Sequence, residues 1–259
     1  MFVFIRKTVW FLAESLQCIN FACMIDVEKI KLIAFDADDT LWDCQSHFDE
    51  AERQYSSMLA PWASEDDVRE SLFATETKNM PLLGYGCKAF TLSLIENAVK
   101  VSGDQIGAAE IRRILELGRR LLTIDATPLP GVETTLTALR ADGRWPLVVF
   151  TKGELLDQQL KLKRSGLAHL FQGCVIVSDK TPEAYLDLCS RYGTDMEHLL
   201  MVGNSFKSDI APVLRLGGWA VHVPFEHEWR HEMTETFDHA HLATIEQMVD
   251  LLPMLKVAR

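Results

Sequence analysis

The stretch Leu32-Ile33-Ala34-Phe35-Asp36-Ala37-Asp38-Asp39-Thr40 joins a run of apolar residues to three acids and a hydroxyl. The apolar run lies between Lys31 and Asp36, and it predicts a buried strand of a parallel sheet. Open α/β sheets bind their ligands at the carboxyl ends of strands, which is where these acids stand. Neighbouring carboxylates repel one another, so a cation or a proton is expected among them. Taken alone, the stretch also fits a turn with solvated carboxylates.

The rest of the chain alternates between strand and helix patterns. Further apolar runs at 147–150, 174–177, 199–202 and 219–223 predict strands, and helical patterns separate them, the last at 245–252. This alternation predicts an α/β fold with a doubly wound, Rossmann-like parallel sheet. Between residues 44 and 128 apolar residues recur at helical spacing, which predicts an inserted bundle of roughly four helices. Residues 80–86 predict a turn between two of these helices.

These patterns divide the chain into three parts. We expect an N-terminal extension at 1–23, a core formed by 24–45 and 129–259, and a helical cap domain at 46–128. Glu14 interrupts the apolar start, and Arg6 and Lys7 follow the first apolar residues, so the extension lacks the pattern of a signal peptide or a membrane span. We expect it to be dispensable, with an amphipathic membrane-associating arm as the alternative.

Composition limits the partners of the protein. The formal net charge of −11 argues against a general nucleic-acid or anionic-membrane binder, because such surfaces need clustered Lys and Arg. The six cysteines form no CxxC pair, so they are typical of scattered thiols in a reducing compartment. We therefore expect a soluble cytoplasmic protein, either a monomer or a homodimer, with no membrane or nucleic-acid partner.

Polar residues that suit phosphate chemistry follow four of the predicted strands, and they occur in a familiar order. Together they resemble the motifs of the haloacid dehalogenase-like (HAD) hydrolase superfamily, over essentially all of 31–252. The matching motifs are DxDxT as Asp36–Thr40, a strand ending in Thr151, Lys180 before Thr181-Pro182, and the element Gly203–Asp209. The resemblance implies a Mg²⁺-dependent phosphatase whose helical insertion is a C1 cap, which closes over the site and selects the substrate.

The resemblance also implies roles for individual residues. Asp36 would attack phosphorus to form an aspartyl-phosphate, and Asp38 would protonate the leaving alcohol and then deprotonate water. Thr151, Lys180 and the neighbouring Lys152 would bind the phosphate. Mg²⁺ would be held by the Asp36 carboxylate, the Asp38 main-chain carbonyl and the side chains of the fourth motif, which are Asn204 and Asp209.

Two positions depart from the family pattern. Asp39 stands where many members have Gly, which Asp tolerates because it can adopt unusual turn conformations. Asn204 stands where the first acid of the fourth motif usually is, and its amide oxygen can ligate a hard cation without contributing charge. We expect either weaker metal binding or a larger contribution from Asp209. The presence of Asp38 favours phosphoryl transfer over dehalogenation, because dehalogenating members typically lack this acid.

Two further segments are candidates for the mouth of the site. In Gly84–Lys88 the glycines permit a sharp turn, and Lys88 could meet an anionic substrate; a plain turn with a solvated lysine is the alternative. His222, His227 and His231 do not have a recognised metal-ligand spacing, so a loop flanking the active site is favoured over a metal cluster.

These observations predict an enzyme that hydrolyses a small phosphomonoester, such as a sugar phosphate, phosphoglycolate or a nucleoside monophosphate. A phosphomutase with the same nucleophile remains an alternative. A catalytically silent, phosphate-binding interaction protein is the other, and Asn204 is the only hint of it.

Overall fold

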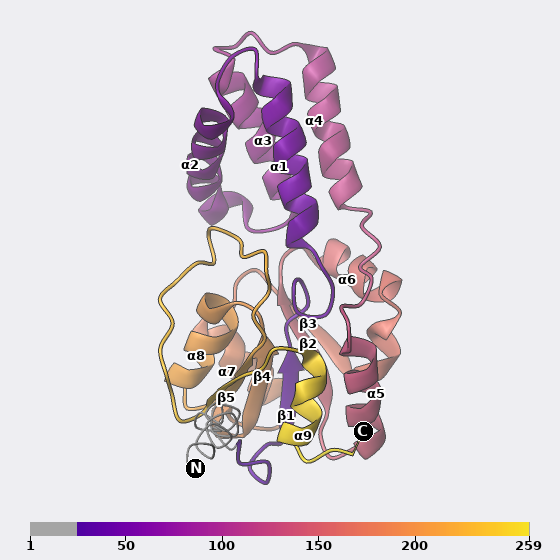
Figure 1. Ribbon diagram of the computed structural model, residues 1–259. Coiled ribbons are helices and arrows are strands. Elements are labelled where there is room, and N and C mark those ends of the chain that lie inside the picture. The colour runs from indigo at the N-terminus through magenta and orange to yellow at the C-terminus, as the bar shows by residue number, and fades with distance from the viewer. Residues whose placement is uncertain (1–24, 259) are drawn as a thin grey trace, which may run out of the picture.

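The computed structural model describes residues 25–258, so the extension predicted at 1–23 lies outside the described residues. Six parallel strands form one sheet in the order β3-β2-β1-β4-β5-β6 (Figure 1). Their bounds are β1 Leu32–Phe35, β2 Leu147–Lys152, β3 Gly173–Val177, β4 Leu199–Gly203, β5 Trp219–His222 and β6 Leu242–Thr244. The predicted doubly wound α/β fold is therefore confirmed.

Helices cover both faces of this sheet and form a separate bundle. The helices are α1 Gln45–Leu59, α2 Glu65–Leu83, α3 Cys87–Val101, α4 Ala108–Leu121, α5 Val132–Asp142, α6 Leu155–Arg164, α7 Pro182–Arg191, α8 Ala211–Arg215 and α9 Leu251–Met254. Short 3-10 segments occupy Leu167–Leu170, Met196–His198 and Met248–Asp250, and a π-helical turn spans Phe206–Ile210.

The strand that opens the fold has apolar residues on both of its faces. Ile33 and Phe35 pack in a core shared with α5 and α9, whereas Leu32 and Ala34 pack in a second core shared with α7 and α8. All four residues are fully buried. A strand covered on both sides reads as a continuous apolar run, which is why this stretch could be recognised.

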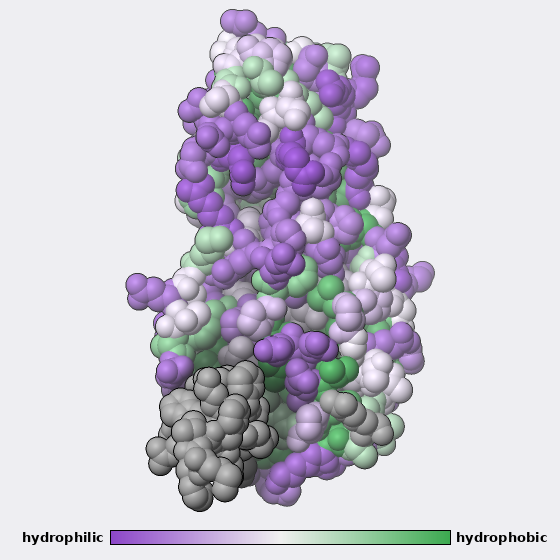
Figure 2. Space-filling view, in the orientation of Figure 1, coloured by the Kyte–Doolittle hydropathy of each residue, from purple (hydrophilic) through white to green (hydrophobic). Residues whose placement is uncertain are grey.

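Helices α1 to α4, which we call the helical insertion (residues 45–121), have an apolar core of their own. Tyr55 lies in this core, where its hydroxyl donates to the carbonyl of Leu94 at 3.0 Å and accepts from Asn97 at 2.9 Å. In Figure 1 the insertion stands over the end of the sheet from which the β1 chain leads into α1. Its outer surface in that orientation is mostly hydrophilic (Figure 2).

Three local predictions were wrong. Strand β6 was not predicted, and the last helix begins at Leu251, not at residue 245. Helix α2 continues through Pro81 to Leu83, so the turn predicted at 80–86 is confined to 84–86. Gly84, with φ of 72°, ends the helix, and its N–H donates to the carbonyl of Met80 at 2.9 Å.

Within residues 25–258, none of the helices combines the length and the apolar character that a membrane crossing requires.

Candidate active site

A cavity of about 160 Å³ lies between the carboxyl ends of the strands and the helical insertion. Chain segments diverge after β1 and β4, which are neighbours in the sheet although they are far apart in the sequence. Such a switch point is where open α/β sheets form ligand crevices. The cavity contains all but one of the predicted site residues, namely Asp36, Asp38, Thr151, Lys152, Lys180, Asn204 and Asp209.

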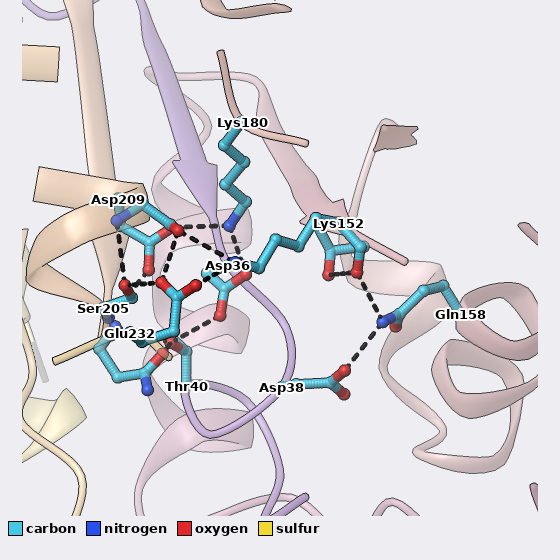
Figure 3. Close-up of polar contacts among 12 residues, drawn as sticks. Asp36, Asp38, Thr40, Lys152, Gln158, Lys180, Ser205, Asp209 and Glu232 are labelled. Carbon is cyan, nitrogen blue, oxygen red and sulfur yellow. Dashed lines mark hydrogen bonds and ion pairs between the residues drawn. The ribbon is translucent and has the colours of Figure 1, made fainter. Parts of the chain in front are cut away.

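Lys180 joins the end of β1 to the segment after β4. Its Nζ is ion-paired with Asp36 and lies 2.6 Å from Oδ1 of Asp209 (Figure 3). The lysine and Asp209 are almost fully buried. Although burial lowers it, the two carboxylates raise the pKa of Lys180 above its ordinary value. A charged lysine is therefore held against the predicted nucleophile, where it can also meet a phosphate.

Asp209 uses both of its carboxylate oxygens within the protein. Oδ1 accepts from Lys180, and Oδ2 accepts from the backbone N–H of Ser205 at 3.0 Å. Burial raises the pKa of Asp209 to about 7, although the charge of Lys180 acts in the opposite direction. Asp209 is therefore a partner of Lys180, and its carboxylate has no oxygen free of protein contacts for a metal ion.

Asp38 is held by three side-chain donors, of which two come from α6. Lys161 Nζ lies 2.6 Å from Oδ2, Gln158 Nε2 donates to the same oxygen at 2.8 Å, and Trp42 Nε1 donates to Oδ1 at 2.7 Å. Burial raises the pKa of Asp38, but the positive charge of Lys161 and the hydrogen bonds from all three donors outweigh that effect and hold it below its ordinary value. Sequence reasoning found Asp38 but missed Lys161 and Gln158.

The turn after β1 is closed by Asp39 and Thr40. Asp39 has φ of 63°, in the left-handed region, and its carboxylate accepts from the N–H groups of Cys44 and Gln45 at 2.8 Å each. It thereby satisfies two backbone N–H groups at the start of α1, which gives a physical reason for an acid at position 39. Thr40, the last residue of this turn, is almost fully buried.

The oxygens that could hold a metal ion lie around Thr40. Its Oγ1 is 3.2 Å from Oδ2 of Asp36 and 3.1 Å from Oδ1 of Asn204, and it accepts from the Asn204 N–H at 3.0 Å. A carboxylate oxygen and an amide oxygen thus lie beside one hydroxyl, and together they form a set of hard oxygen donors. This set fits Mg²⁺, which prefers oxygen ligands and keeps several waters.

No group of three or more His, Cys, Asp or Glu side chains between residues 25 and 258 is arranged to hold a metal ion. The three histidines considered in the sequence accordingly have other contacts. His222 approaches the carbonyl of Asn204 at 3.0 Å, His227 pairs with Asp49 at 3.1 Å, and His231 stacks on Phe73 with ring centroids 4.2 Å apart.

Lys152 is anchored by a second buried acid that sequence reasoning missed. Its Nζ is ion-paired with Glu232 and lies 3.1 Å from the hydroxyl of Ser208. Glu232 also accepts from the hydroxyls of Ser205 and Ser208, so it caps the turn that follows β4 (Figure 3). The loop of residues 223–241, which supplies Glu232, has no periodic pattern that would mark it.

The structure does not bring Lys88 to the cavity. Its side chain is 58% exposed, and its Nζ is paired with Glu154 at the start of α6. Thr151, in contrast, is almost fully buried and lines the cavity at the end of β2.

Comparisons with known proteins identify relatives of most of the chain. The sequence model of a family described as haloacid dehalogenase-like hydrolase matches residues 30–217. The chain is 27% identical over 202 residues to a glyceraldehyde 3-phosphate phosphatase of Methanopyrus kandleri, covering 75% of this chain and 84% of that protein.

Solved structures agree with this grouping. A haloacid dehalogenase-like family hydrolase from Xanthomonas campestris is 33% identical, covers 88% of this chain and 92% of its own, and has a TM-score of 0.77. A 2-haloacid dehalogenase from Pseudomonas syringae pv. tomato shares the fold at 21% identity, with a TM-score of 0.59 and coverage of 88% of this chain and 98% of its own. The fold alone therefore does not distinguish phosphatase from dehalogenase chemistry.

Proposed function

The chain belongs to the haloacid dehalogenase-like hydrolase family, and from this we propose that it hydrolyses a small phosphomonoester with Asp36 as the nucleophile. The observation that supports the proposal best is the position of Lys180, ion-paired with Asp36 at the floor of the cavity. A cation beside the nucleophile suits an anionic substrate, since it attracts the phosphate and offsets its repulsion from the carboxylate. The phosphatase name of the Methanopyrus relative points the same way.

The proposed reaction has two displacements. An oxygen of Asp36 forms a bond to phosphorus as the bond to the leaving oxygen breaks, and Asp38 supplies the proton that the leaving alcohol takes. Water then attacks the aspartyl-phosphate, Asp38 takes a proton from that water, and phosphate leaves with the Asp36 carboxylate restored. The lowered pKa of Asp38 favours the ionised form that the second displacement needs, whereas the first displacement requires Asp38 to carry a proton when the substrate is bound.

Three oxygens would hold a divalent cation, for which we propose Mg²⁺: those of the Asp36 carboxylate, the Asp38 main-chain carbonyl and the Asn204 amide. When bound, the cation neutralises charge that the nucleophile and the phosphate bring together. Lys180, Thr151 and Lys152 would orient the phosphate, and the helical insertion would act as the cap that excludes bulk water.

Asp38 also favours phosphoryl transfer over dehalogenation. A departing alkoxide needs a proton, whereas a departing halide does not, so a positioned acid after Asp36 is useful only in the first case. Its fixation by Lys161, Gln158 and Trp42 matches a group whose orientation matters.

The decisive experiment measures phosphate release from p-nitrophenyl phosphate with and without Mg²⁺. Wild-type protein should turn over only with the cation, and Asp36→Asn should be inactive because an amide does not attack phosphorus. Asp187→Asn, which changes an exposed acid on α7, is the matched control and should keep the wild-type rate. Beryllofluoride with Mg²⁺ should form its adduct on Asp36. Turnover by Asp36→Asn would overturn this mechanism, and an inactive wild-type protein that still binds phosphate would favour the silent binder.

A further inference from the structure

The wall of the cavity formed by the helical insertion has no positive charge among the described residues. Its one charged side chain is Glu76 of α2, and its other polar side chains are those of Gln45, Asn79, Tyr85 and Ser93. The remaining lining residues from the insertion are small or apolar. This wall faces the part of a substrate that lies beyond the phosphate, because the phosphate-binding residues are all in the core.

The core does not supply a spare cation either. The lysines that line the cavity are Lys152, Lys161 and Lys180, and each is ion-paired with at least one carboxylate of the protein. Lys180 is committed to Asp36 and the phosphate under the proposed function. Lys161 is 3% exposed and bound to Asp38, and Lys152 is bound to Glu232. A second anionic group on the substrate would therefore find no cation of its own.

Backbone N–H groups at the start of a helix could also bind an anion. At the start of helix α3, however, a carboxylate of the core already accepts such an N–H group. Helix α3 begins at the cavity, and its Lys88 N–H donates to Oε1 of Glu154 at 3.2 Å. The Lys88 ammonium pairs with the same carboxylate. Glu154 thus takes the position that a substrate carboxylate would need.

The polar groups of this wall are instead suited to accept hydrogen bonds. The amide nitrogen of Asn79 donates to Ser93 at 3.2 Å and to Glu96 at 2.8 Å, and that of Gln45 donates to Asp49 at 2.8 Å. Within residues 25–258 neither amide oxygen accepts a hydrogen bond, so both remain available as acceptors. The side chain of Glu76 is 11% exposed, and the Nε2 atom of His231 lies 3.7 Å from its carboxylate, beyond hydrogen-bond distance.

Within residues 25–258 no group donates a hydrogen bond to the carboxylate of Glu76, and a substrate that donates to a part-buried carboxylate is favoured. We propose that the leaving group of the substrate is uncharged and hydroxylated, as in a polyol or aldose phosphate, and that Glu76 selects it by accepting its hydroxyls. The same carboxylate would repel a leaving group that ends in a carboxylate, such as glycolate or glycerate. The rings of Tyr85 and Trp229 pack edge to face, with their centroids 5.9 Å apart. They line the cavity with an aromatic surface against which the carbon–hydrogen face of such a molecule can pack.

This inference rests on the proposed phosphatase activity, and it is tested with matched esters. Glyceraldehyde 3-phosphate and glycerol 3-phosphate each differ from 3-phosphoglycerate by the group that replaces its carboxylate. We expect kcat/KM on the two uncharged leaving groups to exceed that on 3-phosphoglycerate by on the order of tenfold or more, because like charges meet in a part-buried site. Glycolate as leaving group, offered as phosphoglycolate, should be equally poor.

Glu76→Gln keeps the shape of the side chain and removes its charge. It should raise kcat/KM on 3-phosphoglycerate and raise KM on the uncharged substrates, so that the preference falls to within about threefold. Glu116→Gln, which makes the same charge change on the exposed face of α4, should leave the preference as in wild type. A wild-type enzyme that hydrolyses the carboxylate esters as well as the uncharged ones would overturn this inference alone. Absence of phosphate release from every ester, including p-nitrophenyl phosphate, would instead overturn the phosphatase proposal and this inference with it.

Discussion

Lys161 Nζ lies 2.6 Å from Oδ2 and 2.8 Å from Oδ1 of Asp38, and only 3% of the lysine side chain is exposed. The same ammonium is 3.7 Å from Asp157, one helical turn earlier. The carboxylates of Asp157, whose side chain is almost fully buried, and of Asp38, whose side chain is 27% exposed, thus share one buried cation. Such a pair is a strong constraint on geometry, because removing one partner leaves the other charge without compensation.

We predict that Lys161→Met strongly destabilises the protein. The substitution keeps an unbranched side chain but removes the cation that pairs with Asp38 and Asp157. The free energy of unfolding should fall by about 3–5 kcal/mol. Urea unfolding at pH 7 measures it. Lys163→Met lies on the exposed side of the same helix and should change stability by less than about 0.5 kcal/mol. Equal midpoints for the two variants would mean that the buried pair contributes no net stability.

Helix α6 explains why this pair could not be predicted from the sequence. The leucines of residues 155–164 indicate a helix, but Leu155 and Leu156 are 62% and 59% exposed, and of its four leucines only Leu162 is buried. Asp157, Gln158 and Lys161 are buried instead. The helix turns its polar face to the cavity because Gln158 and Lys161 bind the carboxylate of Asp38 there. Asp38 is far from this helix in the sequence. Only the helical spacing of the three polar residues was a local signal.

The sheet and the motif residues, in contrast, were predictable because their signals are local. A buried strand such as β1 is an apolar run, and the polar residues that follow it are read directly from the chain. Strand β6 has only three residues at the sheet edge, where its exposed side removes the continuous apolar pattern. Glu232 was missed for a related reason, since its role depends on Lys152 and the turn after β4, contacts that no periodicity records.

Asp38→Asn should separate the acid–base role from binding. We expect it to lose ~10²–10⁴-fold in kcat on an alkyl phosphate, the usual share of general acid–base catalysis. Metal and phosphate binding should persist, because its proposed metal ligand is the main-chain carbonyl. The loss should be smaller on p-nitrophenyl phosphate, whose leaving group needs little protonation. Rates with both esters and the affinity for inorganic phosphate are the measurements. An equal loss on the two esters would contradict a role in protonating the leaving group.

Glu52 in α1 should make stability depend on pH. Burial, reinforced by the charges of Glu76 and Asp49, raises the pKa of Glu52 from 4.5 to about 7. The folded state therefore holds an extra proton between these two values, and its stability falls as pH rises through that window. We predict that Glu52→Gln stabilises the protein at pH 8 by ~1–3 kcal/mol and that the gain shrinks steadily toward pH 4.5.

Thermal unfolding across this pH range tests the prediction for Glu52. The control is Glu116→Gln, an exposed acid outside the cavity. Its effect should be small and nearly the same at every pH. A gain for Glu52→Gln that is constant with pH, or largest at the acidic end, would contradict the raised pKa as its cause.

Asn204→Asp should strengthen metal binding and lower the stability of the metal-free protein. The Asn204 oxygen is 3.1 Å from the Thr40 hydroxyl, which is itself 3.2 Å from an Asp36 oxygen. A second carboxylate here adds charge to the ligand set, and we expect the Mg²⁺ concentration for half-maximal activity to fall by about tenfold, or ~1.4 kcal/mol. Without metal, the two carboxylates repel each other, and the thermal midpoint should fall below that of wild type.

Thermal unfolding with and without Mg²⁺ measures this effect independently of activity. Asn204→Asp should show the larger rise in midpoint on adding Mg²⁺, because the cation relieves a repulsion that the wild-type amide does not create. Gln105→Glu adds the same charge at an exposed turn between α3 and α4 and should respond to the metal as wild type does. If Asn204→Asp has an unchanged Mg²⁺ requirement and an unchanged midpoint shift, the residue at 204 is not a metal ligand. The amide would then act only through its contact with Thr40, and the cation site would have to be sought among the other oxygens around Asp36.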